Sequence, residues 1–505
     1  MTQAGKRTVA LGELVETALD ATVSDWPHIP VSGVAIDSRL VKPGDVFIAV
    51  PGTATDGHRH LGAAAQAGAA AAVVERVTGD PIVQIRIENT RRAIAEISHR
   101  FFGNPGRRMK IFAVTGTNGK TSICAVVECI ARAAGRAIGV LGTVGHRIGD
   151  EYVPTANTTP EALDLDRLFC RMLDLGVTEC VMEVSSHAVK LDRVHGVPFA
   201  GAVFTNLTRD HLDFHPDMDD YRRTKERLFR ENLQPHGFAI INVDDPAGAS
   251  FVEAAQRATV WRYSLTDKDA ELRWKTLDES LTGSTGVLFT PVGSLNIRTP
   301  LWGSFNFANL TAAAGVAIAL GYPPQAIVEG LAGFCGVRGR VQPVRGNSNF
   351  GVFVDYAHTP DALHRVLGAA RPLVRGRLRV LFGCGGDRDR GKRPHMARAV
   401  GQYADDIYLT SDNPRSEDPM KIIADVLEGF ADPEAIVVEP DRTRAIERIL
   451  SDCVPGDCAF LCGKGHETAQ LIGGDRIEFD DRVVASRVLM HLGHTVETGD
   501  TLPYG

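Results

Sequence analysis

A short glycine-rich segment between a strand-like and a helix-like stretch places the strongest constraint on this chain. Ile111–Thr115 has the composition of a buried strand, Gly116–Gly119 follows it, and Ser122–Ala134 has the composition of a helix. In such a loop, backbone N–H groups can converge on phosphate oxygens because glycine lacks the Cβ that would clash. The N-terminus of the following helix adds partial positive charge. The segment therefore predicts a polyphosphate site on an α/β sheet.

Lys120 and Thr121 stand where a P-loop places its lysine and its hydroxyl residue. Lys120 would reach the β- and γ-phosphates of a nucleotide, and the hydroxyl of Thr121 would coordinate Mg²⁺. The loop is shorter than the common P-loop, because Val114 occupies the position of that pattern's first glycine. A plain glycine turn beside an incidental Lys-Thr pair is the alternative. The coincidence of strand, loop and helix favours the phosphate site.

The length and the alternation of elements predict three α/β domains. A chain of 505 residues is too long for one hydrophobic core. The cluster Gly103–Gly106 breaks regular structure and indicates a linker. Strand and helix patterns then alternate, which predicts a mostly parallel sheet of P-loop type with helices on both faces. We expect a small N-terminal α/β domain, a central ATP-binding domain and a Rossmann-like C-terminal domain, at residues 1–107, 108–340 and 341–505.

Composition excludes several other classes of protein. The net charge of −7 gives no reason to expect a nucleic-acid surface. No apolar run is long enough to span a bilayer, and the N-terminal residues lack the apolar core of a signal peptide. The nine cysteines form no CxxC pair, which indicates reduced thiols rather than disulfides. We therefore expect a cytoplasmic protein without nucleic-acid partners or a membrane span.

Polar clusters follow the predicted strands, at the edge where a parallel sheet binds its ligands. Glu183 ends an apolar stretch and could bind Mg²⁺, although a salt bridge at the strand end is an equal alternative. The run Thr205–His215 contains two acids, two imidazoles and an arginine, but it lacks the cysteines or the HExxH context of a zinc site. Further clusters of this kind are Asp355–Pro360, Gly383–Pro394, Ser411–Arg415 and Gly463–Glu467.

Other polar residues carry no clear signal by themselves. Lys225 stands in a charged helical stretch, where a lysine is usually a solvated surface residue. Asn306 and Asn309 are one helical turn apart, so their amides could bind a nucleotide base. Helix capping explains the two asparagines equally well.

Taken in order, the motifs resemble the Mur ligase family of peptidoglycan synthesis over nearly the whole chain. The motifs are TGTNGKT, the NTTP loop, EVSSHA, TNLTRDHLDFH, YRRTKERLF, DYAHTPDAL, GCGGDRDRGKRP, DNPR and GKGHE. The resemblance implies an ATP-dependent acid–amino-acid ligase that acts through an acyl phosphate and needs no covalent enzyme nucleophile. Within the family, it points to the branch that adds meso-diaminopimelate to the D-glutamate of UDP-N-acetylmuramoyl-L-alanyl-D-glutamate.

The resemblance also implies roles for the residues at the matching motif positions. Catalysis would involve Lys120, Glu183, His211, Lys225 and His358. Mg²⁺ would be bound by Thr121, Glu183, His211 and Lys225, the last as a CO₂-derived carbamate. ATP would contact Gly116, Thr117, Asn118, Gly119, Lys120, Thr121, Asn306, Asn309, Arg340 and Asp355. The UDP-linked dipeptide would contact Ser38, Asn157, Thr158, Thr159, Ser185, Arg193 and Lys225. Diaminopimelate would contact Arg388, Asp412, Asn413, Pro414, Arg415, Gly463 and Glu467.

The DNPR form of one motif bears on the choice of amino acid. Arg415 can bind the distal carboxylate of diaminopimelate bidentately, and lysine has no such carboxylate. A surface arginine after a proline turn is the alternative. L-lysine as the substrate and a folylpolyglutamate-synthase-like ligase remain alternatives of the same chemistry, although the DSR, PGD and DGH motifs near the N-terminus argue against folate. A nucleotide-gated NTPase switch is the alternative from another class. We expect small-molecule substrates as the only partners, and a monomer.

Overall fold

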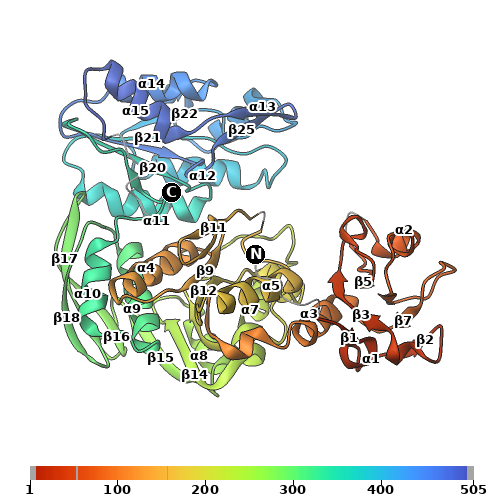
Figure 1. The fold of residues 1–505 in the computed structure, drawn as a ribbon. Helices are drawn as coiled ribbons and strands as arrows, with labels where there is room; N and C mark the ends of the chain where they lie inside the picture. The colour runs from red at the N-terminus through yellow and green to blue at the C-terminus, as the bar shows by residue number, and fades with distance from the viewer. Residues whose placement is uncertain (1–6, 53–54, 156, 498–505) are drawn as a thin grey trace.

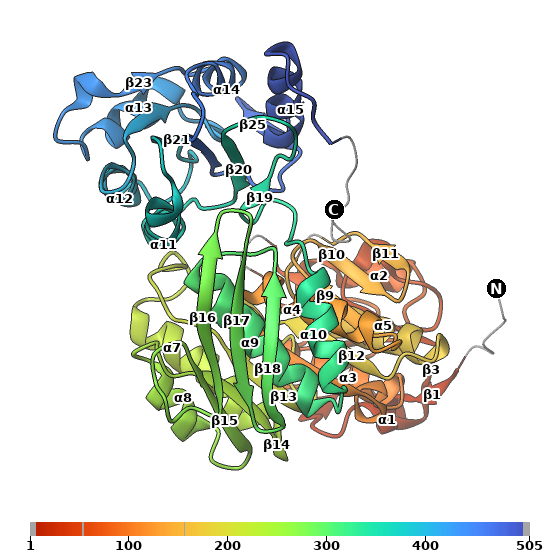
Figure 2. The same ribbon diagram turned by 90° about the vertical axis from the view of Figure 1, so that its left-hand side faces the viewer.

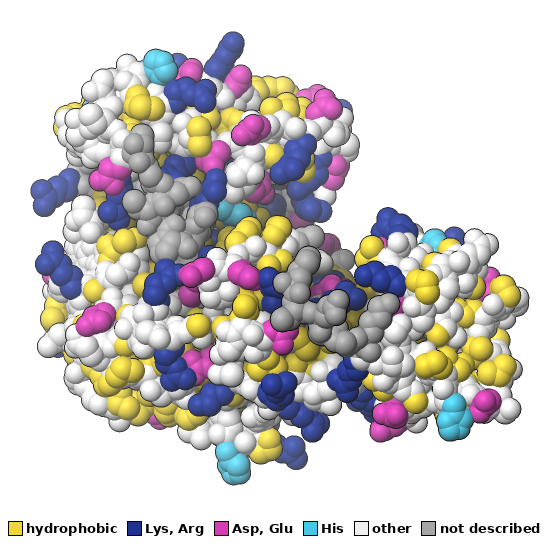
Figure 3. Space-filling view, in the orientation of Figure 1, with side chains coloured by type: hydrophobic (Ala, Val, Ile, Leu, Met, Phe, Trp, Pro, Cys, Tyr) yellow, Lys and Arg dark blue, Asp and Glu magenta, His cyan; other side chains and the backbone are white. Residues whose placement is uncertain are grey.

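The computed structural model describes residues 7–52, 55–155 and 157–497, which form three α/β units along the chain (Figure 1). The first unit, drawn in red, lies beside the central one, and the last, drawn in blue, lies above it. None of the helices in these ranges is long and apolar enough to cross a membrane. On the face drawn in Figure 3, charges of both signs are interspersed.

The N-terminal unit contains a five-stranded sheet in the order β2-β7-β6-β5-β4. Only β2 runs antiparallel to its neighbour. Strand β4 is followed by a 3₁₀ turn, in which the Asp37 side chain accepts a hydrogen bond from the Arg39 N–H. The elements are β1 (Val9–Ala10), α1 (Leu11–Leu14), β2 (Asp20–Ala21), β3 (Pro30–Val31), β4 (Gly33–Ala35), η2 (Ser38–Leu40), β5 (Asp45–Ile48), α2 (Leu61–Gln66), β6 (Ala71–Val74), β7 (Gln84–Arg86) and α3 (Thr90–Phe101).

The central unit contains an eleven-stranded sheet in the order β11-β10-β9-β12-β8-β13-β14-β15-β16-β17-β18. The run from β9 to β16 is parallel, and antiparallel strands extend both edges. Figure 2 shows the long antiparallel strands β16–β18 along one edge. The strands are β8 (Lys110–Thr115), β9 (Gly139–Gly142), β10 (Gly145–Ile148), β11 (Glu151–Val153), β12 (Glu179–Glu183), β13 (Phe199–Phe204), β14 (Leu233–Asn242), β15 (Thr259–Ser264), β16 (Leu272–Ser280), β17 (Gly283–Thr290) and β18 (Gly293–Thr299).

Helices cover both faces of this sheet, as the alternating pattern predicts. One buried cluster packs α4, α9 and α10 against the strands, and a second packs α5, α6 and α8 against the opposite face. A π-helical turn (η5, Leu228–Asn232) directly follows α7. The helices are α4 (Lys120–Ala133), α5 (Ala162–Asp174), α6 (Ser186–Lys190), α7 (Met218–Arg227), α8 (Gly248–Ala254), α9 (Ser304–Ala319) and α10 (Pro324–Gly333).

The C-terminal unit contains a six-stranded sheet in the order β19-β20-β24-β21-β22-β23, in which only β19 is antiparallel. The hairpin β25–β26 and five helices complete it. The strands are β19 (Gln342–Pro343), β20 (Gly351–Asp355), β21 (Leu378–Phe382), β22 (Asp406–Leu409), β23 (Val437–Val438), β24 (Cys458–Cys462), β25 (Ala469–Ile472) and β26 (Asp475–Glu478). The helices are α11 (Pro360–Ala370), α12 (Lys392–Gly401), α13 (Pro419–Leu427), α14 (Arg442–Ser451) and α15 (Asp481–His491). This architecture confirms the predicted α/β fold class with a large, mostly parallel central sheet.

Candidate functional site

The glycine loop between β8 and α4 has a backbone that only glycine can adopt at two positions. Gly116 has a φ of +142°, and a Cβ there would lie 1.9 Å from the Thr205 hydroxyl oxygen. Gly119 has a φ of +90°, and a Cβ there would lie 2.5 Å from the Asn309 side-chain oxygen. The loop therefore packs directly against the residue that follows β13 and against α9, and it leads into the N-terminus of α4.

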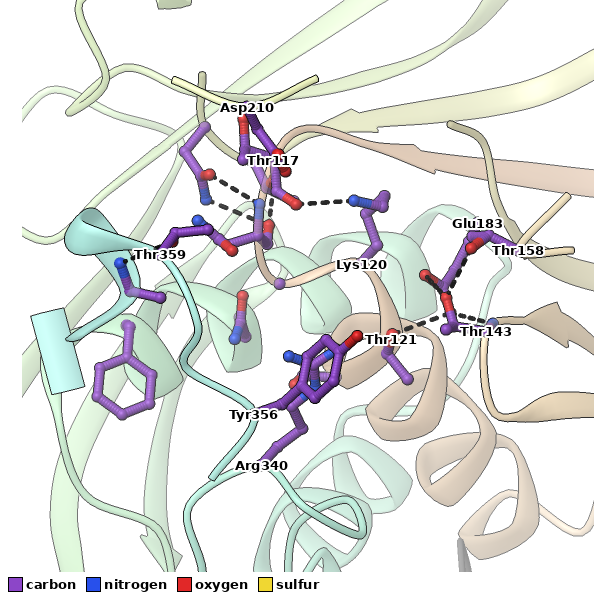
Figure 4. A pocket seen from close by; sticks show the side chains of 18 of the residues that line it. Thr117, Lys120, Thr121, Thr143, Thr158, Glu183, Asp210, Arg340, Tyr356 and Thr359 are labelled. Atoms are coloured by element: carbon purple, nitrogen blue, oxygen red, sulfur yellow. Dashed lines mark hydrogen bonds between the residues drawn. The ribbon is translucent and has the colours of Figure 1, made fainter. Parts of the chain in front are cut away.

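Lys120 is held against this loop (Figure 4). Its Nζ donates hydrogen bonds to the carbonyl oxygens of Gly116 and Thr117, at 2.9 and 2.8 Å. Burial lowers the pKa of Lys120, and the nearby carboxylates of Glu183 and Asp210 oppose that shift. The lysine is thus a partly buried cation at the N-terminus of α4, which suits a polyphosphate, whereas the N–H groups of Thr117 and Asn118 donate to Asn206.

Glu183 lies at the end of β12 and is 1% exposed. Its carboxylate accepts hydrogen bonds from the Thr121 hydroxyl at 3.0 Å and from the N–H and hydroxyl of Thr143 at 2.8 and 3.0 Å (Figure 4). Two hydroxyls and a backbone amide thus hold this carboxylate, in the place of the cation that a salt bridge at the strand end would supply.

The hydroxyl of Thr121 and the carboxylate of Glu183 are hard oxygen donors that fit Mg²⁺. Across the described ranges, no group of three or more His, Cys, Asp or Glu side chains could hold a metal by itself. Mg²⁺ commonly takes several of its ligands from substrate phosphates and water. A pair of protein oxygens beside a phosphate loop is therefore a suitable place for it.

Three imidazoles lie together beyond Glu183. The ring of His187 stacks on the ring of Phe214, with centroids 3.9 Å apart. The ring of His211 lies edge-on to the His187 ring, with centroids 4.9 Å apart. The ring of His215 lies 6.1 Å from that of His187. Burial lowers the pKa of His187 to about 4 and also lowers the pKa of His211. At neutral pH the rings of His187 and His211 are therefore uncharged, as a metal ligand must be. His211 has a φ of +54°, so the loop turns sharply at this residue.

Lys225, on α7, is 1% exposed, so it is not the surface residue that its sequence context suggests. Its Nζ donates to the Gly116 carbonyl oxygen at 3.1 Å and lies 4.7 Å from the centre of the Tyr221 ring. Burial, and then the charge of Lys120, lower the pKa of Lys225 well below its ordinary value. Nothing in the local sequence could have revealed this position, because α7 reaches the loop only through the fold.

The phosphate loop opens into a cavity of about 540 Å³ between the central and C-terminal units. On the C-terminal side, the guanidinium of Arg340 lies over the ring of Tyr356 at 4.7 Å. Asp355 accepts hydrogen bonds from the backbone N–H groups of Val341 and Ala357, and burial raises its pKa although Arg340 opposes the shift. Asn306 and Asn309 line the opposite wall from the first turns of α9.

Most of the residues predicted for ATP and for the UDP-linked dipeptide line this same cavity. Arg193 forms an ion pair with Glu161 at 2.8 Å and donates to the Thr159 carbonyl oxygen at 3.1 Å. Ser38 lies in the N-terminal unit and is not on the wall of this cavity. The predicted residues on the cavity wall are Thr117, Asn118, Gly119, Lys120, Thr121, Asn157, Thr158, Thr159, Glu183, Ser185, Arg193, His211, Asn306, Asn309, Arg340, Asp355 and His358.

A second cavity, of about 1050 Å³, adjoins the first and is walled mainly by the C-terminal unit. It brings together most of the residues predicted for the amino acid, although Pro414 is not on its wall. Those on the wall are Arg388, Asp412, Asn413, Arg415, Gly463 and Glu467. The residues that line both cavities are His187, Asp210, His211, Tyr356, His358 and Thr359. A substrate group in one cavity can therefore reach the other.

Arg415 reaches the second cavity from a strained backbone. Its φ is +52°, and its guanidinium donates to the Gly386 carbonyl oxygen at 2.6 Å. Its own N–H and C=O groups pair with Leu471 and Gly473 of the β25–β26 hairpin. Arg415 is therefore partly exposed on the cavity wall, with its backbone tied to the hairpin and its guanidinium tied to the loop after β21, and such a guanidinium can bind a carboxylate.

Sequence reasoning missed residues that complete both walls. Thr143 bridges Glu183 and Thr158 through its hydroxyl, and no motif marks it. Tyr356 supplies the flat surface beneath Arg340, although it stands inside the noted Asp355–Pro360 cluster. For Tyr356, its place next to Asp355 at a strand end was a signal in the sequence that could have identified it. For Thr143, the sequence contains no such signal.

Three family models match the chain in order. They are the "Mur ligase family, catalytic domain" over residues 30–102, the "Mur ligase middle domain" over residues 114–317, and the "Mur ligase, glutamate ligase domain" over residues 339–465.

Individual proteins match over nearly the full length. A UDP-N-acetylmuramoyl-L-alanyl-D-glutamate–2,6-diaminopimelate ligase of Bacillus licheniformis is 43% identical over 469 residues, which are 92% of this chain and 95% of the relative. The ligase of the same name from Geobacillus thermodenitrificans is 42% identical over 481 residues, 93% of this chain and 98% of the relative. A solved structure of a ligase with this name matches with a TM-score of 0.72 and 35% identity, covering 97% of this chain and all of that one.

Proposed function

The chain belongs to the Mur ligase family, and from that premise we propose that it joins meso-diaminopimelate to the D-glutamate of UDP-N-acetylmuramoyl-L-alanyl-D-glutamate with ATP as the phosphoryl donor. It is an ATP-dependent acid–amino-acid ligase of peptidoglycan biosynthesis. The relatives that carry this name are 42–43% identical over more than nine-tenths of the chain. The observation that supports the reaction most directly is the pair of adjoining cavities, because an acyl group activated in one must meet an amine held in the other.

The first cavity would activate the acceptor. The reaction transfers the γ-phosphoryl group of ATP to the D-glutamate carboxylate, and the amino group of the incoming residue then displaces phosphate from this acyl phosphate. Two anions must be held close together in line. Lys120 and the N-terminus of α4 would bind the phosphates, which requires Lys120 to exchange its two carbonyl partners for phosphate oxygens.

Mg²⁺, when bound, neutralises the negative charge that the two substrates bring together. Thr121 and Glu183 would hold it, and neutral His211 would contribute a nitrogen ligand. Asn306, Asn309, Arg340 and Asp355 would bind the nucleoside of ATP. Asn157, Thr158, Thr159, Ser185 and Arg193 would orient the dipeptide, and Ser38 of the N-terminal unit would contact the uridine end.

Lys225 would act as a carbamate. Carbamylation joins the neutral ε-amine to CO₂ with loss of one proton, and the depressed pKa of Lys225 favours the neutral amine. The product is a carboxylate on α7 next to the phosphate loop, a suitable additional ligand for Mg²⁺. This role would be catalytic, and so would that of His358, which lines both cavities.

The second cavity would hold the amino acid. Arg415 would bind the distal carboxylate of diaminopimelate, and Arg388, Asp412, Asn413, Pro414, Gly463 and Glu467 would complete the site. We further propose three domains at residues 1–107, 108–340 and 341–505, whose closure around the substrates completes the catalytic cleft, and a monomer in the cytoplasm, where ATP and the nucleotide-linked precursor are available.

The test is ATP-dependent phosphate release with UDP-N-acetylmuramoyl-L-alanyl-D-glutamate, with meso-diaminopimelate compared against L-lysine. Release that requires both the acceptor and diaminopimelate is the expected result. Release with lysine instead would overturn the role of Arg415 and keep the reaction. Phosphate release without acceptor would favour an NTPase switch, and activity only with a folate acceptor would favour a folylpolyglutamate-synthase-like ligase.

The carbamate makes a separate prediction. Lys225→Ala should lose more than about 100-fold in kcat, since one charged stabilising group is removed, and added short carboxylates should restore part of the activity. Arg223→Ala, on the same helix, is the matched control. Wild-type turnover in Lys225→Ala would exclude the carbamate.

A further inference from the structure

Lys464 is a fully buried cation behind the second cavity. It follows β24 and is 0% exposed. Its Nζ donates to the Asn413 side-chain oxygen at 3.0 Å and to Glu467 Oε2 at 2.9 Å, and it lies 4.0 Å from a carboxylate oxygen of Asp412. One ammonium group thereby joins the loop after β22 to the loop after β24.

These contacts fix the orientation of the Asn413 amide. Its Oδ1 accepts from Lys464 Nζ and from the backbone N–H of Leu471, both at 3.0 Å. Its Nδ2 therefore points away from the lysine and donates to Glu467 Oε2 at 2.8 Å. Without the lysine, one of the two donors that select this amide orientation would be lost.

Lys464 also controls the charge of Glu467. Burial would raise the pKa of Glu467, but Lys464 and the Asn413 amide outweigh it, and the pKa is lowered. The other charged or titratable groups facing Glu467 are His466 on its own loop, Asp412 on the loop after β22 and Tyr356 on the loop after β20. The pKa of His466 is lowered to about 4 by burial, so this ring does not titrate near neutral pH.

Glu467 is thus an ionised carboxylate with one oxygen already bound. Both of its side-chain hydrogen bonds within the described ranges use Oε2. Glu467 lines the second cavity, whereas Lys464 does not. An incoming ammonium group can therefore bind the remaining oxygen, while the lysine stays behind the wall.

We propose that Lys464 is a positioning residue for the amino-acid substrate: together with the Asn413 amide it holds Oε2 of Glu467, so that the other carboxylate oxygen faces the non-reacting ammonium group of a diamino acid. The inference rests on the proposed function. The inference adds Lys464 as a residue that acts through Glu467 and touches none of the three substrates. The reacting amino group must stay free for attack, so the group bound by Glu467 is the other one.

The test compares Lys464→Met, Lys464→Arg and the exposed Lys421→Met on the same unit. Steady-state kinetics are measured with respect to each substrate in turn. In Lys464→Met, the KM for meso-diaminopimelate should rise about 10- to 100-fold, the range for one charge-assisted hydrogen bond. The KM values for ATP and for the UDP-linked dipeptide should stay within about twofold. Lys464→Arg should show a smaller rise, because it keeps the charge, and Lys421→Met should show none.

A pH profile separates positioning from simple loss of structure. Lys464→Met removes the largest of the effects that oppose the burial of Glu467, so the pKa of Glu467 rises and kcat/KM for diaminopimelate should fall on acidification at a higher pH than in the wild type. Lys464→Arg should keep the wild-type profile. An unchanged profile together with an unchanged KM in Lys464→Met would overturn the proposal.

The double variant Lys464→Met/Glu467→Gln gives a further check. If the lysine acts through Glu467, the double variant should be no worse than Glu467→Gln alone. Fully additive losses would assign Lys464 a role independent of Glu467 and overturn the proposal. A wild-type enzyme that fails to use diaminopimelate would instead overturn the proposed function, and the inference with it.

Discussion

The two adjoining cavities are built in different ways. The phosphate cavity relies on backbone: glycines at positive φ, the N-terminus of α4, and a lysine that binds carbonyl oxygens of its own loop. The amino-acid cavity relies on buried cations. Arg393 binds the Gly385 carbonyl oxygen, Arg442 binds those of Ser411 and Cys462, and Lys464 binds Asn413 and Glu467.

The difference follows from what each cavity binds. A phosphate chain presents the same oxygens in every nucleotide, so a local backbone loop can serve it. A diamino acid differs from its competitors by single charged groups, and specificity for such groups requires side chains at defined positions. Arg393 holds the loop after β21, and Arg442 and Lys464 both join the loop after β22 to the end of β24. This unit therefore depends on long-range contacts of buried cations in a way that the phosphate loop does not.

The largest expected effect is on the stability of the C-terminal unit. Arg442→Met leaves Asp481 as an unpaired, fully buried carboxylate, since both side chains of the pair are inaccessible. Breaking one half of such a pair costs about 3–5 kcal/mol. Urea unfolding should show this loss, and Arg444→Met, at a residue with 73% side-chain exposure, should show almost none. A loss below about 1 kcal/mol, roughly the value of an exposed pair, would break the contrast between the cavities.

Lys120 tests the other side of the comparison. Lys120→Ala should lower kcat about 10²- to 10³-fold, because a charged donor to the transferred phosphoryl group disappears. The unfolding free energy should change little, since the lysine bonds only to carbonyl oxygens of its own loop. Single-turnover phosphate release and urea unfolding measure the two quantities. A large loss of stability with unchanged kcat would reverse the assignment.

Arg415 should affect affinity rather than stability or the phosphate cavity. Arg415→Ala removes a bidentate partner for a carboxylate, a loss of about 1.5–3 kcal/mol, so the KM for diaminopimelate should rise about 10- to 150-fold. The KM for the UDP-linked dipeptide should not change. Arg415→Lys tests whether the fork geometry matters in addition to the charge. Equal KM values for wild type and Arg415→Ala would remove this residue from the site.

The smallest expected effect lies outside both cavities, where the N-terminal unit meets the central one. His99, on α3, pairs with Asp166 of α5 at 2.8 Å. Burial would lower the pKa of His99, but the Asp166 carboxylate outweighs it and the pKa is raised. The pair therefore stabilises the fold fully below the unfolded-state pKa of about 6.5, and the benefit is lost as the pH rises through the higher folded-state pKa.

The variant His99→Gln tests the direction in which this stabilisation changes with pH. The variant should lose about 1 kcal/mol of unfolding free energy at about pH 6 and less at about pH 9. Urea unfolding at the two pH values measures the difference. A loss that grows with pH would contradict the raised pKa.

Local sequence patterns predicted the phosphate loop and most strands of the sheets. The strand, the glycines and the helix around Lys120 are contiguous, so the sequence predicted their structure closely: β8 is Lys110–Thr115 and α4 is Lys120–Ala133. Residues 435–438 show the limit of such patterns, because their apolar composition predicts a strand over the whole segment. In the structure Ala435 ends a 3₁₀ turn, and Val437–Val438 alone pair with β22, at the edge of the sheet.

The sequence by itself determined the α/β class, the order of the motifs and, through their resemblance to a family, the reaction. It could not show that Lys225 is buried against Gly116, that Thr143 holds Glu183, or that Lys464 joins two loops behind the amino-acid cavity. Those contacts join residues that are up to 109 positions apart. Only the packing of distant strands and helices brings such residues together, and burial in that packing lowers the pKa of Lys225.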